Sequence, residues 1–198
     1  SAGMIVLNPN ARSTIKFGMD NKLFATGSVK YVGSEIRAVL LSKMKIHENK
    51  NLCVISGESI AVEAAMMNGE GTVIAVEYKE RDRETMEENV NQFGLHNVVI
   101  VDHVGEDTMG NLPVPDTTML VASASLEQEL GYLTKLNPNM EFVIYTLDFK
   151  AAASMRDILA KFGITDFTVI QIAVSKLTSK NVFENQPAPW IISAKAGV

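Results

Sequence analysis

Two stretches of this chain carry residue types that can bind a nucleoside. The first, Ser56-Gly57-Glu58, follows the apolar run 52–55 and precedes a helical segment, so backbone N–H groups there would point at an anionic group. The second is Glu77, which ends the apolar run 72–76 about 20 residues later. An acid at this place can accept hydrogen bonds from both hydroxyls of a ribose. The spacing therefore predicts a nucleoside site, and it leaves a solvent-exposed glutamate at a strand end as the alternative.

Four neighbouring residues would border the same crevice. Tyr78 could lie against a base, or could be a partly exposed tyrosine without a ligand. Val104 and Gly105 follow the apolar run 98–101, whose carboxyl end would reach the same edge of a sheet. His103 is the most conspicuous ionisable group, but a loop histidine is more often solvated than catalytic, so we assign no catalytic residue. The histidines, the cysteine and the acids show no spacing that is typical of a metal site.

Alternating apolar runs and amphipathic segments are expected to position these residues. Ser34 is expected to cap the helix before the first strand. Gly57 gives the turn its conformational freedom, and Ser56 or Ser59 caps the following helix. Strands are expected over residues 52–55, 72–77, 98–101, 117–122, 141–146, 167–174 and 190–194. Helices separate the first five or six strands, which predicts a parallel, Rossmann-like α/β sheet, whereas the last two have no helix between them and should pair antiparallel.

Composition is that of an ordinary soluble domain. Of the 198 residues, 46% are hydrophobic, and no apolar run reaches the roughly 18 residues of a membrane span. A net charge of −5 without a compensating basic cluster argues against a nucleic-acid partner. The single cysteine, Cys53, lies in an expected core strand, which excludes an internal disulfide and fits a cytoplasmic protein without a signal peptide. We expect a leader over residues 1–32, with a short strand at residues 4–7, and one α/β domain over residues 33–198.

Several stretches, each weak by itself, form a more specific pattern together. They are Gly18–Phe24, Glu35-Ile36-Arg37-Ala38, Leu41-Ser42-Lys43, Glu63-Ala64-Ala65, Val76-Glu77, Asn89 with Phe93-Gly94 and Asn97-Val98, Leu112-Pro113 with Pro115-Asp116, and Trp190-Ile191-Ile192. Over nearly all of residues 17–194 this pattern resembles the decarboxylating precorrin C5,C15-methyltransferase family of cobalamin biosynthesis, in its C15-methylating domain. The resemblance implies the class I S-adenosylmethionine methyltransferase fold, with a seven-stranded, mostly parallel sheet and an antiparallel last strand.

The chain departs from the family's Asp-x-Gly-x-Gly-x-Gly motif, which an ungapped match places at residues 52–58. Leu52 stands at the position of the opening acid. Val54, Ser56 and Glu58 stand at the positions of the three glycines. Other family positions differ at Val32-Gly33, His103, Val121-Ala122 and Asn139-Met140. Side chains at these places would crowd the methionine part of the cofactor, and Glu58 would face its carboxylate.

The resemblance implies methyl transfer from S-adenosylmethionine to a ring carbon of a tetrapyrrole-like substrate, coupled to loss of an acetate carboxyl as carbon dioxide. The residues expected to bind the cofactor are Ser56, Gly57, Glu58, Glu77, Tyr78, Val104 and Gly105. Family members are often fused to a second methyltransferase domain, so fusion to one or a complex with one is expected, as is a homo-oligomer. The alternative is a degenerate domain that no longer catalyses and serves as a binding or assembly partner. The altered first turn is the feature that discriminates between the two.

Overall fold

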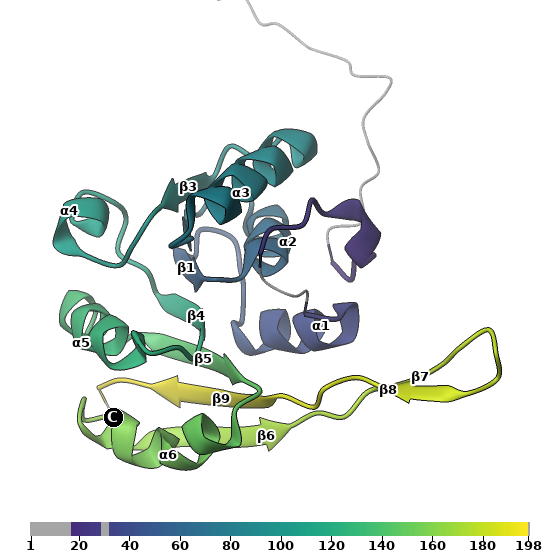
Figure 1. The fold of residues 1–198 in the computed structure, drawn as a ribbon. Coiled ribbons are helices and arrows are strands. Elements are labelled where there is room, and N and C mark those ends of the chain that lie inside the picture. The colour runs from purple at the N-terminus through teal and green to yellow at the C-terminus, as the bar shows by residue number, and fades with distance from the viewer. Residues whose placement is uncertain (1–16, 29–31, 198) are drawn as a thin grey trace, which may run out of the picture.

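The computed structural model describes residues 17–28 and 32–197, which form a central sheet between two layers of helices (Figure 1). The strands of this sheet are β1 (Leu52–Ile55), β2 (Val73–Val76), β3 (Val98–Val101), β4 (Thr117–Val121), β5 (Glu141–Thr146), β6 (Asp166–Gln171) and β9 (Trp190–Lys195). Their order is β3-β2-β1-β4-β5-β9-β6, and β9 runs antiparallel to both of its neighbours. The predicted seven-stranded, mostly parallel α/β sheet is therefore confirmed, including the antiparallel pairing of its last two strands.

The helices divide between the two faces of the sheet. They are α1 (Ser34–Lys43), α2 (Glu58–Asn68), α3 (Glu80–Phe93), α4 (Glu106–Met109), α5 (Leu126–Leu136) and α6 (Phe149–Ala160), with a short 3-10 helix, η1 (Asn21–Leu23), before them. Helices α1 to α3 contribute Leu40 and Met86, among others, to one core. Helices α4 to α6 contribute Leu130 and Leu159 to a second core. The short helix α4 was not predicted, because its sequence is polar apart from Met109.

Strand β1 separates the two cores and belongs to both. Leu52 and Val54 pack in the core under α1 to α3, whereas Cys53 and Ile55 pack in the core under α4 to α6. All four side chains are buried, as a continuous apolar run in a central parallel strand requires. The prediction that Cys53 lies in the core is confirmed.

A two-stranded hairpin, β7 (Ser175–Leu177) and β8 (Phe183–Asn185), projects from the sheet between β6 and β9 (Figure 1). The strand predicted over residues 167–174 ends at Gln171, so its last residues belong to the connection into the hairpin. Leu177, Val182 and Phe183 are exposed on this hairpin. Their side chains therefore contribute little to either core.

The predicted serine caps of the first two helices are wrong. Ser34 is the first residue of α1, and Gly33 occupies the cap position before it. Gly57 occupies the cap position of α2, and neither Ser56 nor Ser59 forms a side-chain capping bond there. In both cases a glycine precedes the helix, so the cap position has no side chain to hydrogen-bond the free N–H groups of the first turn.

A buried ion pair attaches the segment before α1 to the domain. Arg37 of α1 and Glu63 of α2 are fully buried, and Arg37 Nε lies 2.9 Å from Glu63 Oε1. The Arg37 guanidinium also donates to the carbonyl of Met19 and lies 4.7 Å from the centre of the Phe24 ring. The Glu63 carboxylate accepts hydrogen bonds from the backbone N–H groups of Gly18 and Met19. This pair therefore fixes the segment against both helices.

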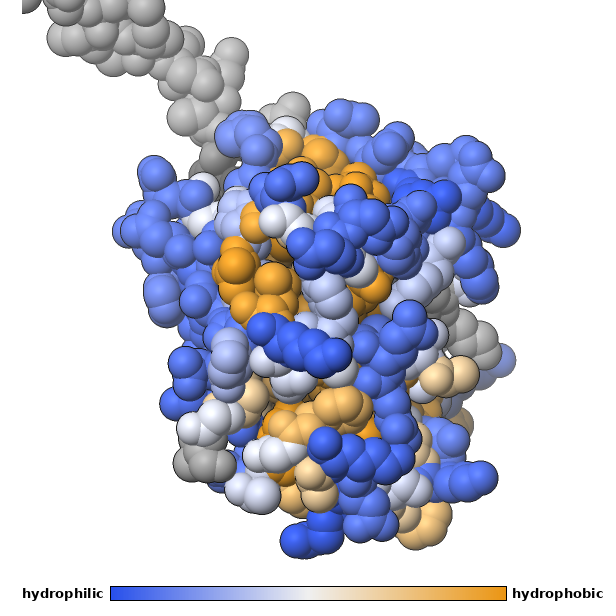
Figure 2. Space-filling view, turned by 90° about the vertical axis from the view of Figure 1, so that its left-hand side faces the viewer, coloured by the Kyte–Doolittle hydropathy of each residue, from blue (hydrophilic) through white to orange (hydrophobic). Residues whose placement is uncertain are grey.

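The strand expected at residues 4–7 and much of the leader expected over residues 1–32 lie outside the described residues. Within the described ranges, no helix combines the length and the apolar character needed to cross a membrane. Figure 2 shows the face at the left of Figure 1, where hydrophilic side chains cover most of the surface and separate two apolar areas.

Candidate functional site

The turn between β1 and α2 has a backbone that differs from the prediction. Ser56 adopts a φ of 57°, in the left-handed region that favours glycine, and its N–H donates to the Val76 carbonyl at 3.0 Å. Gly57 has a φ of −140°, so the prediction that Gly57 supplies the conformational freedom of the turn is wrong. A Cβ atom on Gly57 would lie 2.7 Å from Val54 Cγ1, so close packing is what requires a glycine there. The carbonyl of Gly57 then accepts the first bond of the helix that begins at Glu58.

Three carboxylates meet where β1 and β2 end. Glu58 begins α2, Glu77 follows β2, and Asp82 lies in the first turn of α3. Each side chain contributes one carboxylate oxygen, and these three oxygens all lie within 4.8 Å of one another. The exposed fractions are 7% for Glu58, 1% for Glu77 and 2% for Asp82. The three acids thus form a buried cluster at the sheet edge where the crevice was expected, and this cluster is largely closed to water.

The segment 25–28 closes one side of this crevice. The N–H of Gly27 donates to Glu58 Oε2 at 3.3 Å, and the N–H of Ser28 donates to Asp82 Oδ1 at 2.6 Å. The Ser28 hydroxyl also donates to the Asp82 carboxylate. A Cβ atom on Gly27 would lie 2.2 Å from Glu58 Oε1 and 2.6 Å from Asp82 Oδ1, so a larger residue there would require the two carboxylates to shift.

Burial dominates the proton affinity of two of these acids. The pKa of Glu77 is raised to about 8, mainly by burial and to a smaller extent by the carboxylates of Glu58 and Asp82, while a Gly57 backbone N–H opposes the change. Burial likewise raises the pKa of Glu58 to about 7, with Asp82 as a smaller cause and the Gly27 N–H acting in the opposite direction. Both groups are therefore partly protonated near neutral pH.

These pKa values predict that stability falls as pH rises. Because the folded-state pKa of Glu77, about 8, exceeds its ordinary value of 4.5, the folded protein binds more protons than the unfolded chain between these values. Its contribution is fully present below the ordinary pKa and is lost as pH rises toward the folded one. One pKa unit corresponds to about 1.4 kcal/mol, so after allowance for partial hydration we expect a loss on the order of 2 kcal/mol between roughly pH 5 and pH 9.

Urea unfolding at several pH values in metal-free buffer measures this loss. Glu77→Gln should remove most of the pH dependence, because the amide does not titrate. If the free energy of unfolding of Glu77→Gln depends on pH as strongly as that of the parent chain, a group other than Glu77 causes the pH dependence.

Tyr78 turns toward helix α5. Its hydroxyl donates to Glu129 Oε1 at 2.5 Å, and its side chain is partly exposed. Glu129 is buried, and burial raises its pKa and also that of Tyr78. The structure thus gives Tyr78 a protein partner, and its contact with a base stays a prediction.

Val104 and Gly105 lie beyond β3, and their contacts differ from those of the three carboxylates. Val104 is buried in the core under α4 to α6, and Gly105 occupies the cap position of α4. His103 is partly exposed and bridges two exposed acids, with Nδ1 2.7 Å from Asp102 Oδ1 and Nε2 3.0 Å from Asp107 Oδ1. These acids raise the pKa of His103, which is the environment of a solvated surface histidine.

The sequence analysis missed Asp82 and Glu129. No sequence pattern singled out Asp82, because it approaches Glu58 and Glu77 only through the packing of elements that are distant in sequence. Glu129 carried a signal that could have identified it, since it lies between Leu126 and Leu130 on the apolar face of α5. An acid on such a face needs a partner, and Tyr78 provides one.

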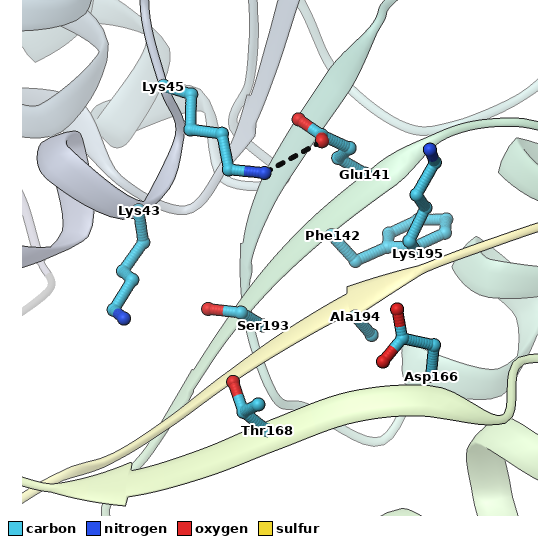
Figure 3. A pocket seen from close by; sticks show the side chains of 9 residues that line it. All are labelled: Lys43, Lys45, Glu141, Phe142, Asp166, Thr168, Ser193, Ala194 and Lys195. Carbon is cyan, nitrogen blue, oxygen red and sulfur yellow. Dashed lines mark hydrogen bonds and ion pairs between the residues drawn. The ribbon is translucent and has the colours of Figure 1, made fainter.

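Two cavities lie elsewhere on the domain. A cavity of about 580 Å³ borders the carboxyl ends of β4 and β5, where Ser123, Leu126, Asp148 and Lys150 line it. A second, of about 280 Å³, lies at the opposite ends of β5 and β6; Figure 3 shows its lysines and acids, with Lys45 paired to Glu141. Only the first cavity shares the sheet edge at which Glu77 ends its strand.

The strand order and the acid after β2 define a class I S-adenosylmethionine methyltransferase fold. A model of the precorrin methyltransferase domain family matches residues 25–189. The chain belongs to that family. None of the curated protein sequences with which it was compared is a match.

Several solved structures share the fold of this chain. A precorrin-6Y C5,15-methyltransferase from Geobacter metallireducens superposes with a TM-score of 0.83 at 23% identity, over 91% of this chain and 97% of that one. The C-terminal domain of precorrin-6Y C5,15-methyltransferase from Rhodobacter capsulatus gives 0.73 at 19% identity, over 92% and 100%. Precorrin 8W decarboxylase from Methanobacterium thermoautotrophicum gives 0.70 at 17% identity, over 92% and 97%.

The residues of the crevice fit S-adenosylmethionine at its ribose end. Glu77 Oε1 is buried and has no hydrogen-bond partner among the described residues, so this oxygen could accept a hydrogen bond from a ribose hydroxyl. The Ser56–Gly57 turn retains a left-handed residue before α2. Glu58 differs from the family motif, and its carboxylate lies within the crevice.

Proposed function

We propose that this chain is an S-adenosylmethionine-dependent methyltransferase that acts on a tetrapyrrole-like substrate, with the decarboxylation that the family resemblance implies. The observation that carries the proposal is the buried, unpartnered Glu77 Oε1 at the end of β2. When bound, S-adenosylmethionine supplies an activated methyl group on its sulfonium. Membership of the precorrin methyltransferase domain family supports this reaction over an unrelated nucleotide-binding function.

Three residues would bind the cofactor, at its ribose and at its methionine end. Glu77 would accept the ribose hydroxyls, and the backbone of Ser56 and Gly57 would hold the methionine end. No general base is assigned, because orientation and proximity supply a large part of the barrier reduction in such a transfer. Glu58 opposes an anionic methionine carboxylate when it is ionised, and its pKa of about 7 lets it accept a proton near neutral pH.

The cavity at the ends of β4 and β5 is our candidate for the substrate. Helices α5 and α6 begin beside it, and Lys150 and Ser123 are among the residues that line it. Helix N-termini and an ammonium group favour a carboxylate, such as the acetate carboxyl that the family resemblance implies, although Glu127 and Asp148 also line the cavity. The cavity lies at the sheet edge that the carboxyl ends of the parallel strands share, as ligand sites of this fold class do.

Calorimetric titration with S-adenosylhomocysteine tests the proposal. This product of methyl transfer would occupy the same site without turnover, and we expect micromolar binding with one molecule per chain. Absence of heat and of a thermal shift at millimolar ligand would favour the alternative, a degenerate domain that serves as an assembly partner.

Glu58→Gly is expected to raise the affinity for S-adenosylhomocysteine by roughly tenfold, or about 1.4 kcal/mol. The change removes both the charge and the bulk that Glu58 adds to the crevice. Glu58→Gln is the matched control, because it removes the charge and keeps the size. If Glu58→Gly binds no better than the parent chain, crowding by Glu58 is not what limits affinity.

We also propose that the chain works in the cytoplasm as a homo-oligomer or beside a second methyltransferase domain. The buried single cysteine is compatible with a reducing compartment, and the exposed Leu177, Val182 and Phe183 of the hairpin support self-association. Light scattering of the purified chain measures its oligomeric state.

A further inference from the structure

We infer that Glu58, Glu77 and Asp82 together bind one divalent cation of the hard, oxygen-preferring class, which comprises Mg²⁺, Mn²⁺ and Ca²⁺. The ligand oxygens of the three carboxylates all lie within 4.8 Å of one another. Oxygens that share such an ion each lie about 2.0 to 2.6 Å from it, so a single ion can reach all three. Carboxylates are the side chains that these ions prefer.

Unpartnered oxygens are the second observation that points to a ligand. Glu58 Oε1 and Glu77 Oε1 are buried, and neither has a hydrogen-bond partner among the described residues. The two side chains are 93% and 99% buried, as the complements of their 7% and 1% exposed fractions. A buried polar atom without a partner destabilises the fold, and more so when it is charged. A metal ion would satisfy both oxygens at once.

The basic side chains nearest in sequence do not neutralise these acids. Lys79 Nζ lies 3.4 Å from the Ser28 hydroxyl, and Arg83 Nη1 donates to the backbone carbonyls of Glu77 and Tyr78 at 3.0 Å. None of the ion pairs found in the described ranges involves a carboxylate of the cluster. Among the described residues, therefore, no cation forms an ion pair with the cluster.

The carboxylates are also held in place before any ion arrives. Glu58 and Asp82 lie in the first turns of α2 and α3, and Glu77 directly follows β2. The N–H groups of Gly27 and Ser28 orient the carboxylates of Glu58 and Asp82. Such support around the ligands is what a metal site needs, because it fixes the direction of each lone pair. The spacing of the three acids in the sequence did not indicate this site, because they belong to three separate elements of the fold.

The site shares Glu77 with the proposed ribose contact, but Asp82 has no role in the proposed function. The test therefore uses cofactor-free protein and a variant of Asp82, so that failure of one proposal leaves the other standing. We expect Mn²⁺ and S-adenosylhomocysteine to compete for the crevice.

Electron paramagnetic resonance of Mn²⁺ gives a direct readout, because the signal of the free aqueous ion decreases when the ion binds. We expect the cofactor-free chain to bind about one Mn²⁺, and Asp82→Asn to weaken this binding roughly tenfold or more. Glu84→Gln is the matched control, since Glu84 is an exposed acid on the same helix, and it should bind as the parent chain does. Mn²⁺ should also raise the thermal unfolding temperature of the parent chain and leave that of Asp82→Asn unchanged.

Glu58→Gln provides a second test in case Asp82→Asn does not fold, and it should weaken Mn²⁺ binding to a similar extent. A full free-ion signal at millimolar Mn²⁺ in the parent chain would overturn the inference. Unchanged binding in folded Asp82→Asn or Glu58→Gln would overturn it as well, because the ion would then lie elsewhere.

Discussion

Replacement of Arg37 by methionine is expected to lower the free energy of unfolding by about 3 to 5 kcal/mol. Arg37 and Glu63 are fully buried and lie 2.9 Å apart, so removal of the guanidinium leaves an unpaired carboxylate in the core. The variant also loses the bond from Arg37 to the Met19 carbonyl, which holds the segment before α1. Urea unfolding followed by circular dichroism measures the loss.

The double variant Arg37→Met/Glu63→Met is the control for this prediction. Because it removes both charges, it should be less destabilised than the sum of the two single variants. Lys22→Met, which removes an exposed cation paired with Asp20 at 3.8 Å, should change stability by no more than a few tenths of a kcal/mol. If Arg37→Met behaved like Lys22→Met, the pair would not be an anchor of the fold.

Glu77→Ala is expected to weaken S-adenosylhomocysteine binding by about 100-fold, or about 2.7 kcal/mol. A carboxylate that accepts both ribose hydroxyls forms two hydrogen bonds to a charged group, and each contributes on the order of 1.5 to 3 kcal/mol. Calorimetry near pH 8, where half of the Glu77 carboxyl groups are ionised at a pKa of about 8, gives the affinity.

Loss of binding in Glu77→Ala should not come from unfolding. The change removes a buried carboxyl group with an unpartnered oxygen, so we expect the variant to be at least as stable as the parent chain at this pH. Glu84→Ala, on the exposed side of α3, should bind normally. An affinity within threefold of the parent value in Glu77→Ala would place the ribose elsewhere and would remove the main support for the proposed function.

Much of the fold could be predicted from sequence because its signals are local. The apolar runs at residues 52–55, 98–101 and 141–146 coincide with β1, β3 and β5. Gly69 and Gly94 follow α2 and α3 with positive φ, as glycines at the ends of helices commonly do. The predicted strand over residues 167–174 extended too far, because β-branched and apolar residues continue past the point where pairing with β9 stops.

The site was less predictable because its contacts join distant segments. Glu77 could be identified, since its place after the second strand follows from the topology of the sheet. The convergence of Glu58 and Asp82 on it depends on how α2 and α3 pack, and no spacing between them encodes that geometry. The turn between β1 and α2 could not be predicted from sequence either. We expected Gly57 to be its flexible residue, whereas Ser56 adopts the left-handed conformation.

The hydrogen bonds from Gly27 and Ser28 to the crevice also affect rates. A ligand that approaches Glu77 from that side has to wait until these bonds open, so association includes an opening step before contact. A gate of this kind lowers the association rate constant. It slows departure too, so the residence time of a bound molecule would depend on segment 25–28 as much as on the residues that touch it.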